Sequence, residues 1–364
     1  MSNRSSRLRA ALLAALLADL CVAAPAGATG PDSRAGAVQI IADMRRIVTP
    51  QGIEETRSVR IGGIDQWISV RGADRRNPVL LMLHGGPGYV AMPTSWYFQR
   101  GWEDYFTVVQ WDQRGAGRTL GKNGPSLGPT ITIDRMARDG IELAELLRRT
   151  LNQNRILLVG HSWGSVLGVF MVKRRPDLFW AYVGTGQVAA DPGRNYAVAY
   201  DEVLKAARRR GDQRAVTELE HVGPPPWHDG RGYAVQRRWA NLFEGADAFL
   251  ASTLGFALTA PGYTARDVND WLSGQSLSAE RLVPQTKAVD SAALGGELAV
   301  PVFVIQGAED FTTPTSLARS FVASLRAPRK EFITIAGGGH FAVFMKSDAF
   351  LKELVSRVLP LISR

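Results

Sequence analysis

The sequence predicts an α/β protein in which helices cover both faces of a mostly parallel sheet. Short apolar runs with strand character alternate with longer segments of helical spacing, as expected for such a sheet. One long segment, residues 191–290, contains no convincing strand and predicts an inserted helical cap. We therefore expect a first part of the sheet domain over 36–190, the cap over 191–290, and the remainder of the sheet domain over 291–364.

Length and composition fit a soluble globular protein. The 364-residue chain is long enough for a large core, and 45% of its residues are hydrophobic and 21% charged. Its formal net charge is +9. The basic residues are scattered in short groups and do not gather with aromatic residues, so we expect solvated helix surfaces and no nucleic-acid site. The composition leaves the oligomeric state open.

The first 28 residues predict a signal peptide. Three arginines in the first nine residues precede an apolar run over 10–18, and Ala26-Gly27-Ala28 offers a cleavage site. The apolar run is too short to span a membrane, so we expect an exported protein, periplasmic or secreted, with no stable membrane span. The single cysteine, Cys21, lies in this segment. Cleavage would therefore leave no disulfide, thiol nucleophile or zinc–cysteine site, and retention of the segment is the alternative.

The strands and helices of the sheet domain follow from apolar runs and turn residues. Two short strands, 57–61 and 66–70, are expected to pair antiparallel around the turn at Gly62-Gly63. The fully apolar run 79–83 predicts a strand buried on both faces. The other expected strands are 106–111, 156–159, 180–183, 300–305 and 331–335, and the expected helices are 133–149, 166–173, 316–325 and 348–359, with 195–210, 233–243 and 265–272 in the cap.

The segment Gly-His-Ser-Trp-Gly at 160–164 joins an apolar strand to a helical segment. This is the sequence form of a nucleophile elbow, a strained turn that lifts the hydroxyl of Ser162 off the sheet. Gly160 and Gly164 must be small because the strand and the helix nearly touch there. The start of the helix directs backbone N–H groups toward the reacting centre, where they can stabilise an oxyanion. The side chain of the flanking His161 is expected to point away from the hydroxyl.

The serine hydroxyl needs two partners. An imidazole must lie within hydrogen-bond reach, and that imidazole needs a carboxylate on its other nitrogen. Of the five histidines, His340 lies in the glycine-rich loop after the last expected strand, where it can reach Ser162. The acid is expected between these two residues in sequence, near a strand end. Asp310 is our choice, and Glu309 is the alternative because a rotation by one position exchanges the carboxylate that faces inward.

Four segments of the chain carry a family resemblance. They are His-Gly-Gly-Pro-Gly at 84–88, Asp-Gln-Arg-Gly-Ala-Gly-Arg at 112–118, Gly-His-Ser-Trp-Gly-Ser at 160–165 and Gly-Gly-Gly-His at 337–340. In this combination the chain, from about residue 57 to the C-terminus, resembles an α/β-hydrolase fold protein of the proline iminopeptidase (peptidase S33) family. The resemblance implies that Gly85 and Gly86 supply one oxyanion-hole N–H and Trp163 the other. It also implies that 112–117 is structural support near the site.

The resemblance also carries an expectation about the cap. Family members cleave an N-terminal residue, typically proline, from a peptide, and acidic cap residues hold the free amine. Glu244 is the first candidate for this role because Ala-Asn-Leu-Phe-Glu at 240–244 is an echo of the family's Trp-x-x-Trp-Glu segment, and Glu202 is the second. The chain departs from the family at His161, where Gly is usual, and at Thr119, where Ser is frequent.

These observations predict a serine hydrolase that forms an acyl-enzyme and releases an N-terminal residue from small peptides. The alternatives are a carboxylesterase that uses the same three side chains on small acyl esters, and a non-catalytic binding protein on the same fold. Epoxide and haloalkane hydrolysis would need a carboxylate nucleophile where this chain has Ser162. No metal or other cofactor is expected, because no ligand cluster is visible in the sequence.

Overall fold

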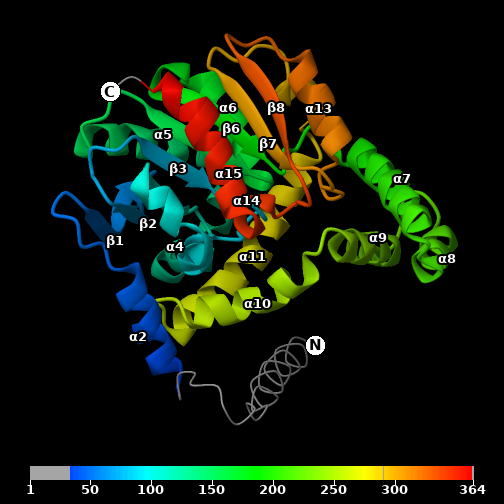
Figure 1. The fold of residues 1–364 in the computed structure, drawn as a ribbon, viewed down its shortest axis with the longest axis horizontal. Coiled ribbons are helices and arrows are strands. Elements are labelled where there is room, and N and C mark those ends of the chain that lie inside the picture. Colours follow the sequence, from blue (N-terminus) through cyan, green and yellow to red (C-terminus); the bar gives the residue numbers. More distant parts are fainter. Residues whose placement is uncertain (1–32, 290, 363–364) are drawn as a thin grey trace.

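The protein is built around an eight-stranded sheet with the order β1-β2-β4-β3-β5-β6-β7-β8 (Figure 1). The computed structural model describes residues 33–289 and 291–362. β2 is antiparallel to both of its neighbours, and every other neighbouring pair is parallel, which confirms the predicted mostly parallel sheet. The strands are β1 (Ile53–Ile61), β2 (Ile64–Gly72), β3 (Val79–Leu83), β4 (Thr107–Asp112), β5 (Ile156–His161), β6 (Phe179–Thr185), β7 (Val302–Gly307) and β8 (Lys330–Ile335).

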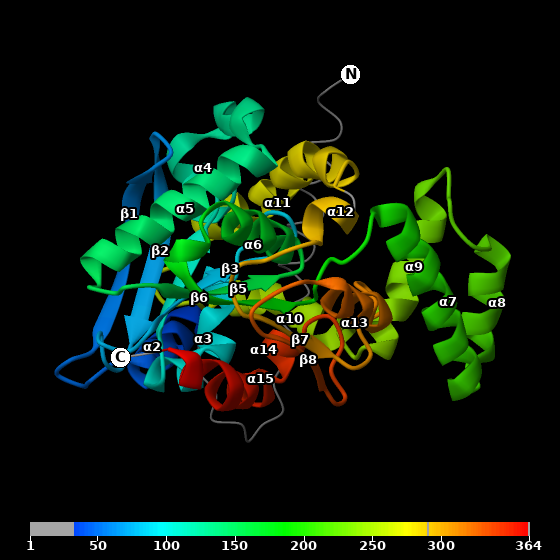
Figure 2. The ribbon, with the colours of Figure 1, turned by 90° about the horizontal axis from the view of Figure 1, so that it is seen from above.

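Helices cover both faces of the sheet, as predicted (Figure 2). Alternate residues of the inner strands point to opposite faces. On β3, Leu81 and Leu83 join the apolar cluster under α5, α6 and α13, whereas Leu80 and Met82 join the cluster under α3, α14 and α15. The bounds of these helices are α3 (Ser95–Phe98), α5 (Ile133–Thr150), α6 (Trp163–Arg174), α13 (Thr315–Ser324), α14 (Ala342–Met345) and α15 (Ser347–Glu353).

The β1–β2 hairpin forms one edge of the sheet and turns at Gly62-Gly63, as predicted. The helix α2 (Arg34–Arg45) precedes it and has no counterpart among the predicted helices, and α4 (Gly117–Asn123) packs beside β2. The signal peptide predicted over residues 1–28 lies outside the described residues. Among the residues that are described, none of the helices combines the length and the apolar character needed to cross a membrane.

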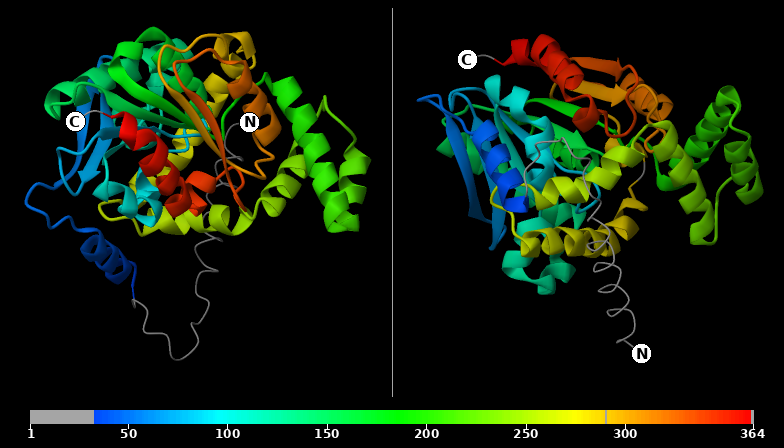
Figure 3. Two further views of the ribbon diagram at one scale, coloured as in Figure 1. Left: turned by 45° about the horizontal axis from the view of Figure 1, so that its top comes forward. Right: turned by 60° about the horizontal axis from the view of Figure 1, so that its bottom comes forward.

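The described residues between β6 and β7 form helices and no strand. Three of these helices, α7 to α9, pack around a small core of their own and stand to the right of the sheet in both panels of Figure 3. α8 and α10 have no counterpart among the predicted helices, and the helix predicted over 265–272 continues as α11 to Thr286. The bounds are α7 (Pro192–Arg210), α8 (Gln213–Val222), α9 (Gly230–Phe243), α10 (Asp247–Leu258), α11 (Ala265–Thr286) and α12 (Ser291–Leu294).

Candidate active site

β5 and α6 meet at Ser162 in a sharp turn. Ser162 has a φ of 54° and a ψ of −119°, a conformation that is costly for a residue with a side chain. A Cβ atom on Gly160 would lie 2.5 Å from the carbonyl oxygen of Gly164, and one on Gly164 would lie 2.1 Å from that of Leu83. Neither position can therefore hold a larger residue, because its Cβ atom would collide with a backbone carbonyl oxygen. α6 begins at Trp163, three residues earlier than predicted, because the helix starts directly after the turn.

The structure brings Ser162, His340 and Asp310 together at the carboxyl ends of β5, β7 and β8. The Nε2 atom of His340 lies 3.1 Å from the Oγ atom of Ser162. Its Nδ1 atom lies 3.1 Å and 3.2 Å from the two carboxylate oxygens of Asp310. Glu309, the alternative acid, is half-exposed and pairs with Arg210 at 3.0 Å. The geometry therefore selects Asp310 over Glu309 as the partner of His340.

Asp310 is fixed by a local hydrogen-bonded turn. The backbone N–H groups of Thr312 and Thr313 donate to its Oδ1 atom at 3.0 and 2.8 Å, and the Thr313 hydroxyl donates to Oδ2 at 2.9 Å. Burial raises the pKa of Asp310, whereas these hydrogen bonds lower it. Thr313 is a site residue that the sequence reasoning missed. Its signal is Asp-Phe-Thr-Thr at 310–313, in which an Asp side chain can bond the backbone two residues on.

The imidazole of His340 is buried. Burial lowers the pKa of His340, and Arg237 acts in the same direction, whereas Glu244 raises it. The ring is therefore neutral near pH 7. With Nδ1 facing a carboxylate, the tautomer that leaves Nε2 free to accept the proton of Ser162 is favoured.

A cavity of about 220 Å³ lies beside Ser162. Gly86 and Trp163, two of the three predicted oxyanion-hole residues, line it. Gly85 packs behind them, where a Cβ atom would lie 3.1 Å from Cβ of Ser162. The indole Nε1 of Trp163 donates to Gln113 at 3.2 Å, so the segment after β4 braces this side of the cavity. Other lining residues are Pro87, Val166, Val188, Ala190, Pro192, Asn195, Tyr196, Val283, Thr286, Lys287, Val289 and Thr313.

Neither of the two predicted amine-binding carboxylates lines this cavity. Glu244 is buried, and its carboxylate accepts the backbone N–H groups of Phe311 and His340 at 2.8 and 2.9 Å. Glu202 accepts the hydroxyl of Ser316 at 2.5 Å. The structure therefore gives both side chains partners within the protein, because the cap packs directly on the loops that follow β7 and β8.

The segment at 112–118, which begins at the end of β4, is held in place by hydrogen bonds and a buried ion pair. The Oδ2 atom of Asp112 accepts the backbone N–H of Arg118 at 2.8 Å, and the Thr119 hydroxyl donates to the Asp112 carbonyl at 2.6 Å. Arg114 forms a buried ion pair with Asp139 at 2.7 Å. Thr119 thus supplies the hydroxyl that a serine would supply at this position.

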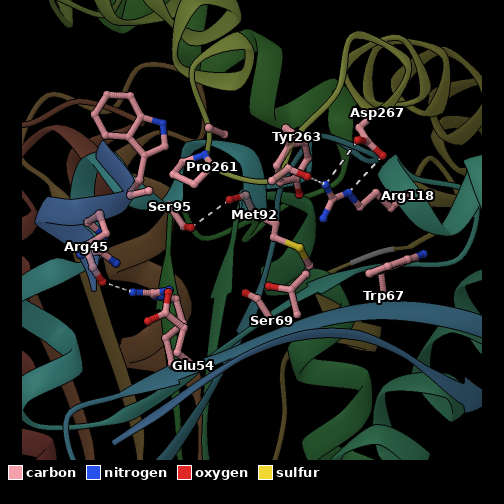
Figure 4. Close-up of a pocket in the computed structure, with 16 residues that line it drawn as sticks. Arg45, Glu54, Trp67, Ser69, Met92, Ser95, Arg118, Pro261, Tyr263 and Asp267 are labelled. Carbon is pink, nitrogen blue, oxygen red and sulfur yellow. Dashed lines mark hydrogen bonds and ion pairs between the residues drawn. The ribbon is translucent and has the colours of Figure 1, made fainter. Parts of the chain in front are cut away.

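A larger cavity, of about 470 Å³, lies away from Ser162 between α2, the sheet edge and the start of α11 (Figure 4). Arg118 contacts Asp267 at 3.1 Å within it, and its guanidinium stacks 3.8 Å from the ring centre of Tyr263. The arginines that line it pair with carboxylates: Arg118 with Asp267, Arg71 with Glu54 and Glu103, and Arg45 with Glu103. The paired charges indicate a structural junction, and Ser162 with its partners is the better candidate for chemistry.

Comparison with known proteins agrees with this fold. A family model described as the alpha/beta hydrolase fold matches residues 78–347. The probable aminopeptidase YbaC of Bacillus subtilis is 28% identical over 302 residues, which are 82% of this chain and 94% of that protein. A probable proline iminopeptidase of Streptomyces coelicolor is 36% identical over 160 residues, which are 43% of this chain and 46% of that protein.

A solved structure extends the likeness to the whole fold. The proline iminopeptidase-related protein from Thermus thermophilus superposes with a TM-score of 0.59 at 21% identity, covering 85% of this chain and 99% of that one. The family model spans most of the chain, including the turn at Ser162 and the loops that carry Asp310 and His340. The protein is therefore a hydrolase: the chain belongs to the alpha/beta hydrolase fold family, and within it the chain resembles the proline iminopeptidases.

Proposed function

We propose that Ser162, His340 and Asp310 form a catalytic triad and that the protein is a serine hydrolase that releases the N-terminal residue of small peptides. The observation that carries the proposal is the chain of contacts from Ser162 through His340 to Asp310, with 3.1 Å at each step. A strained serine, a neutral imidazole and a fixed carboxylate are the three parts that activate a serine hydroxyl.

The reaction follows from these contacts. Ser162 Oγ attacks the substrate carbonyl carbon while His340 Nε2 takes the hydroxyl proton, and Asp310 stabilises the imidazolium that forms. Backbone N–H groups at Trp163 and at the segment 85–86 hold the oxyanion. The intermediate then collapses, and His340 returns the proton to the leaving amine. A water molecule then attacks the acyl carbon while His340 takes its proton. The bond between this carbon and Ser162 Oγ breaks, His340 returns the proton to Oγ, and the acyl product leaves.

The relatives support a peptide as substrate. The Bacillus subtilis protein is named a probable aminopeptidase, and its similarity to this chain extends over 94% of its length. The Streptomyces coelicolor protein is named a probable proline iminopeptidase. The small volume of the cavity beside Ser162 suits a single residue on the acyl side of the scissile bond.

A carboxylesterase is the second candidate, and the cavity lining favours it. None of the described residues that line the cavity is acidic, and Lys287 is the charged residue among them. An aminopeptidase needs a carboxylate near the substrate ammonium, because an unpaired buried charge is costly. An acyl ester has no ammonium and fits this lining without such a partner.

The triad is tested by labelling with a neutral alkyl fluorophosphonate. Ser162→Ala should abolish both labelling and turnover, with a rate loss on the order of 10⁴-fold or more, while the unfolding temperature stays close to that of the wild type. Ser252→Ala is the control, because Ser252 is exposed on α10 and its hydroxyl donates to the carbonyl of Ala248, away from Ser162. Full labelling of Ser162→Ala would assign the nucleophile to another residue.

The substrate class is tested with three compounds on the wild-type enzyme: a prolyl anilide with a free amine, its amine-blocked analogue and a short acyl ester. An aminopeptidase should hydrolyse the free-amine anilide with the highest kcat/KM. Equal or faster hydrolysis of the blocked anilide and the ester would favour the esterase.

A further inference from the structure

The backbone of His340 is held from two sides by side chains outside the triad. Its N–H donates to the Oε2 atom of Glu244 at 2.9 Å. Its carbonyl oxygen lies 3.1 Å from the Nε2 atom of His161, which therefore donates to it. Both side chains are buried, with 7% of Glu244 and 3% of His161 exposed. The position of the imidazole thus depends on a cap residue and on the residue before the nucleophile.

Glu244 also reaches the loop that carries the acid. Its Oε1 atom accepts the backbone N–H of Phe311 at 2.8 Å and the hydroxyl of Thr312 at 3.3 Å. One carboxylate therefore joins the residue that follows Asp310 to the backbone of His340. The contact is close enough to require Gly339, since a Cβ atom there would lie 2.5 Å from Cβ of Glu244.

The same loop is attached to the cap at further points. Phe311 packs in the small core of α7 to α9. Arg210 of α7 binds both the Glu309 carboxylate and the Phe243 carbonyl at 3.0 Å. Asn195 donates to the carbonyl of Thr312 at 3.0 Å. The loop after β7 is thus bonded to the cap at several points, and among these contacts Glu244 is the one that also binds the backbone of His340.

We propose that Glu244 and His161 are positioning residues that hold His340 in its reactive place, so that the cap sets the geometry of the triad. The inference rests on the proposed triad. Neither residue touches the reacting atoms. Glu244 acts through two backbone N–H groups and His161 through one carbonyl, and a buried backbone group that loses its partner costs more than the bond itself.

Two variants remove these contacts with little change in volume. Each carboxylate oxygen of Glu244 accepts one backbone N–H group. In Glu244→Gln, the amide nitrogen replaces one of these oxygens and cannot accept that hydrogen bond. In His161→Phe, the ring volume stays and the donor is lost. Each variant should lower the rate of fluorophosphonate labelling and kcat by roughly 10- to 100-fold with little change in KM. Glu220→Gln is the matched control, because Glu220 is an exposed cap carboxylate paired with Arg208.

A pH profile separates positioning from a loss of folding. The charged groups that act on Glu244 are Asp310 and His340. Arg237 and Glu244 act on His340, and Arg237 also acts on Asp310. His340 in turn acts on His161, and Asp310 acts on Glu202. Because burial raises the pKa of Glu244 to about 7, its carboxylate can accept both backbone N–H groups only above that pH, so kcat should rise through pH 7 in the wild type and lack this step in Glu244→Gln. Glu244→Asp keeps an ionisable carboxyl group and should keep this step while kcat falls.

The results of these experiments distinguish a fault in the proposed triad from a fault in the positioning roles of Glu244 and His161. Persistent labelling of Ser162→Ala would overturn the triad itself. If Ser162→Ala is unlabelled but Glu244→Gln or His161→Phe is labelled at the wild-type rate, that residue has no positioning role. A rise in KM confined to free-amine substrates would instead assign Glu244 to amine binding. If Glu244→Gln fails to fold, Glu244→Asp decides the matter, because a wild-type kcat in that variant would overturn the role of Glu244.

Discussion

At the scale of single residues, the adjacent carboxylates Glu309 and Asp310 have opposite surroundings. Asp310 is buried against His340, and Glu309 is exposed toward Arg210. Asp310→Asn should lower kcat by on the order of 10³- to 10⁴-fold with little change in KM, because an amide stabilises neither the required imidazole tautomer nor its charged form. Steady-state kinetics of Asp310→Asn and Glu309→Gln provide the comparison. A larger loss in Glu309→Gln would reverse the assignment.

Ionisation of Glu244 should also make the free energy of unfolding depend on pH. Burial, followed by the charge of Asp310, raises the pKa of Glu244 to about 7 from an ordinary 4.5. The folded protein therefore favours the neutral form of Glu244. The contribution of this preference to the free energy of unfolding is fully present below about pH 4.5 and is lost as the pH rises through 7. Glutamine does not ionise and has no such loss.

The measurement compares the free energy of unfolding of the wild type and Glu244→Gln by denaturant titration at pH 5 and pH 8.5. From pH 5 to pH 8.5, the free energy of unfolding of Glu244→Gln should rise relative to that of the wild type by on the order of 3 kcal/mol. A difference that is the same at both pH values would show that Glu244 has an ordinary pKa in the folded protein.

At the scale of elements, the start of α6 packs directly against the end of β3, where Gly164 leaves no room for a side chain. In Gly164→Ala, the new Cβ atom would meet the backbone of β3 at 2.1 Å, and a backbone carbonyl cannot move aside like a flexible side chain. The variant should lose more than about 3 kcal/mol of stability. Gly255→Ala is the control: Gly255 lies exposed in α10 with open space around a Cβ atom, and alanine there should stabilise by about 0.5–1 kcal/mol. Thermal unfolding of both variants tests the contrast.

The elements differ in how well the sequence predicts them. The inner strands are predicted because continuous apolar runs such as 79–83 and 156–159 become strands buried on both faces. α10 is apolar on most sides and shows no amphipathic stripe, so its pattern does not stand out. α8 does have an apolar face, with Ala215 and Leu219 buried, but the helix is only ten residues long and is missing from the predicted helices. α11 continues beyond the predicted end at residue 272 to Thr286 and has Pro284 in its last turn, although a proline there costs one hydrogen bond to the preceding turn.

At the scale of the whole molecule, the candidate site is predictable in part. Ser162, Asp310 and His340 each follow a strand, and parallel strands bring their carboxyl ends to one edge of the sheet. The partners of Glu244 are not predictable in this way, because they depend on how the cap docks on the loops after β7 and β8. Docking of an inserted segment is set by side-chain packing across the junction, which no local pattern in the sequence encodes.

The N-terminal segment leads to a prediction for the full chain. If residues 1–28 act as a signal peptide, the full-length protein expressed in a Gram-negative bacterium should appear in the periplasm or medium with Thr29 as its first residue. A chain that starts at residue 29 should stay in the cytoplasm and be labelled by the fluorophosphonate at the same rate, because the proposed triad and the residues that line the cavity beside Ser162 lie at Gly86 and later in the chain.

Cell fractionation and N-terminal sequencing check this prediction, and two variants sharpen it. Ala28→Arg should block cleavage, because a signal peptidase requires a small residue at this position. Cys21→Ser should leave export and cleavage unchanged, since cleavage after Ala28 removes Cys21 with the segment. A full-length protein that stays uncleaved in the cytoplasm would show that the segment is not an export signal. Loss of cleavage in Cys21→Ser would instead indicate that the cysteine is modified and that processing takes place next to it.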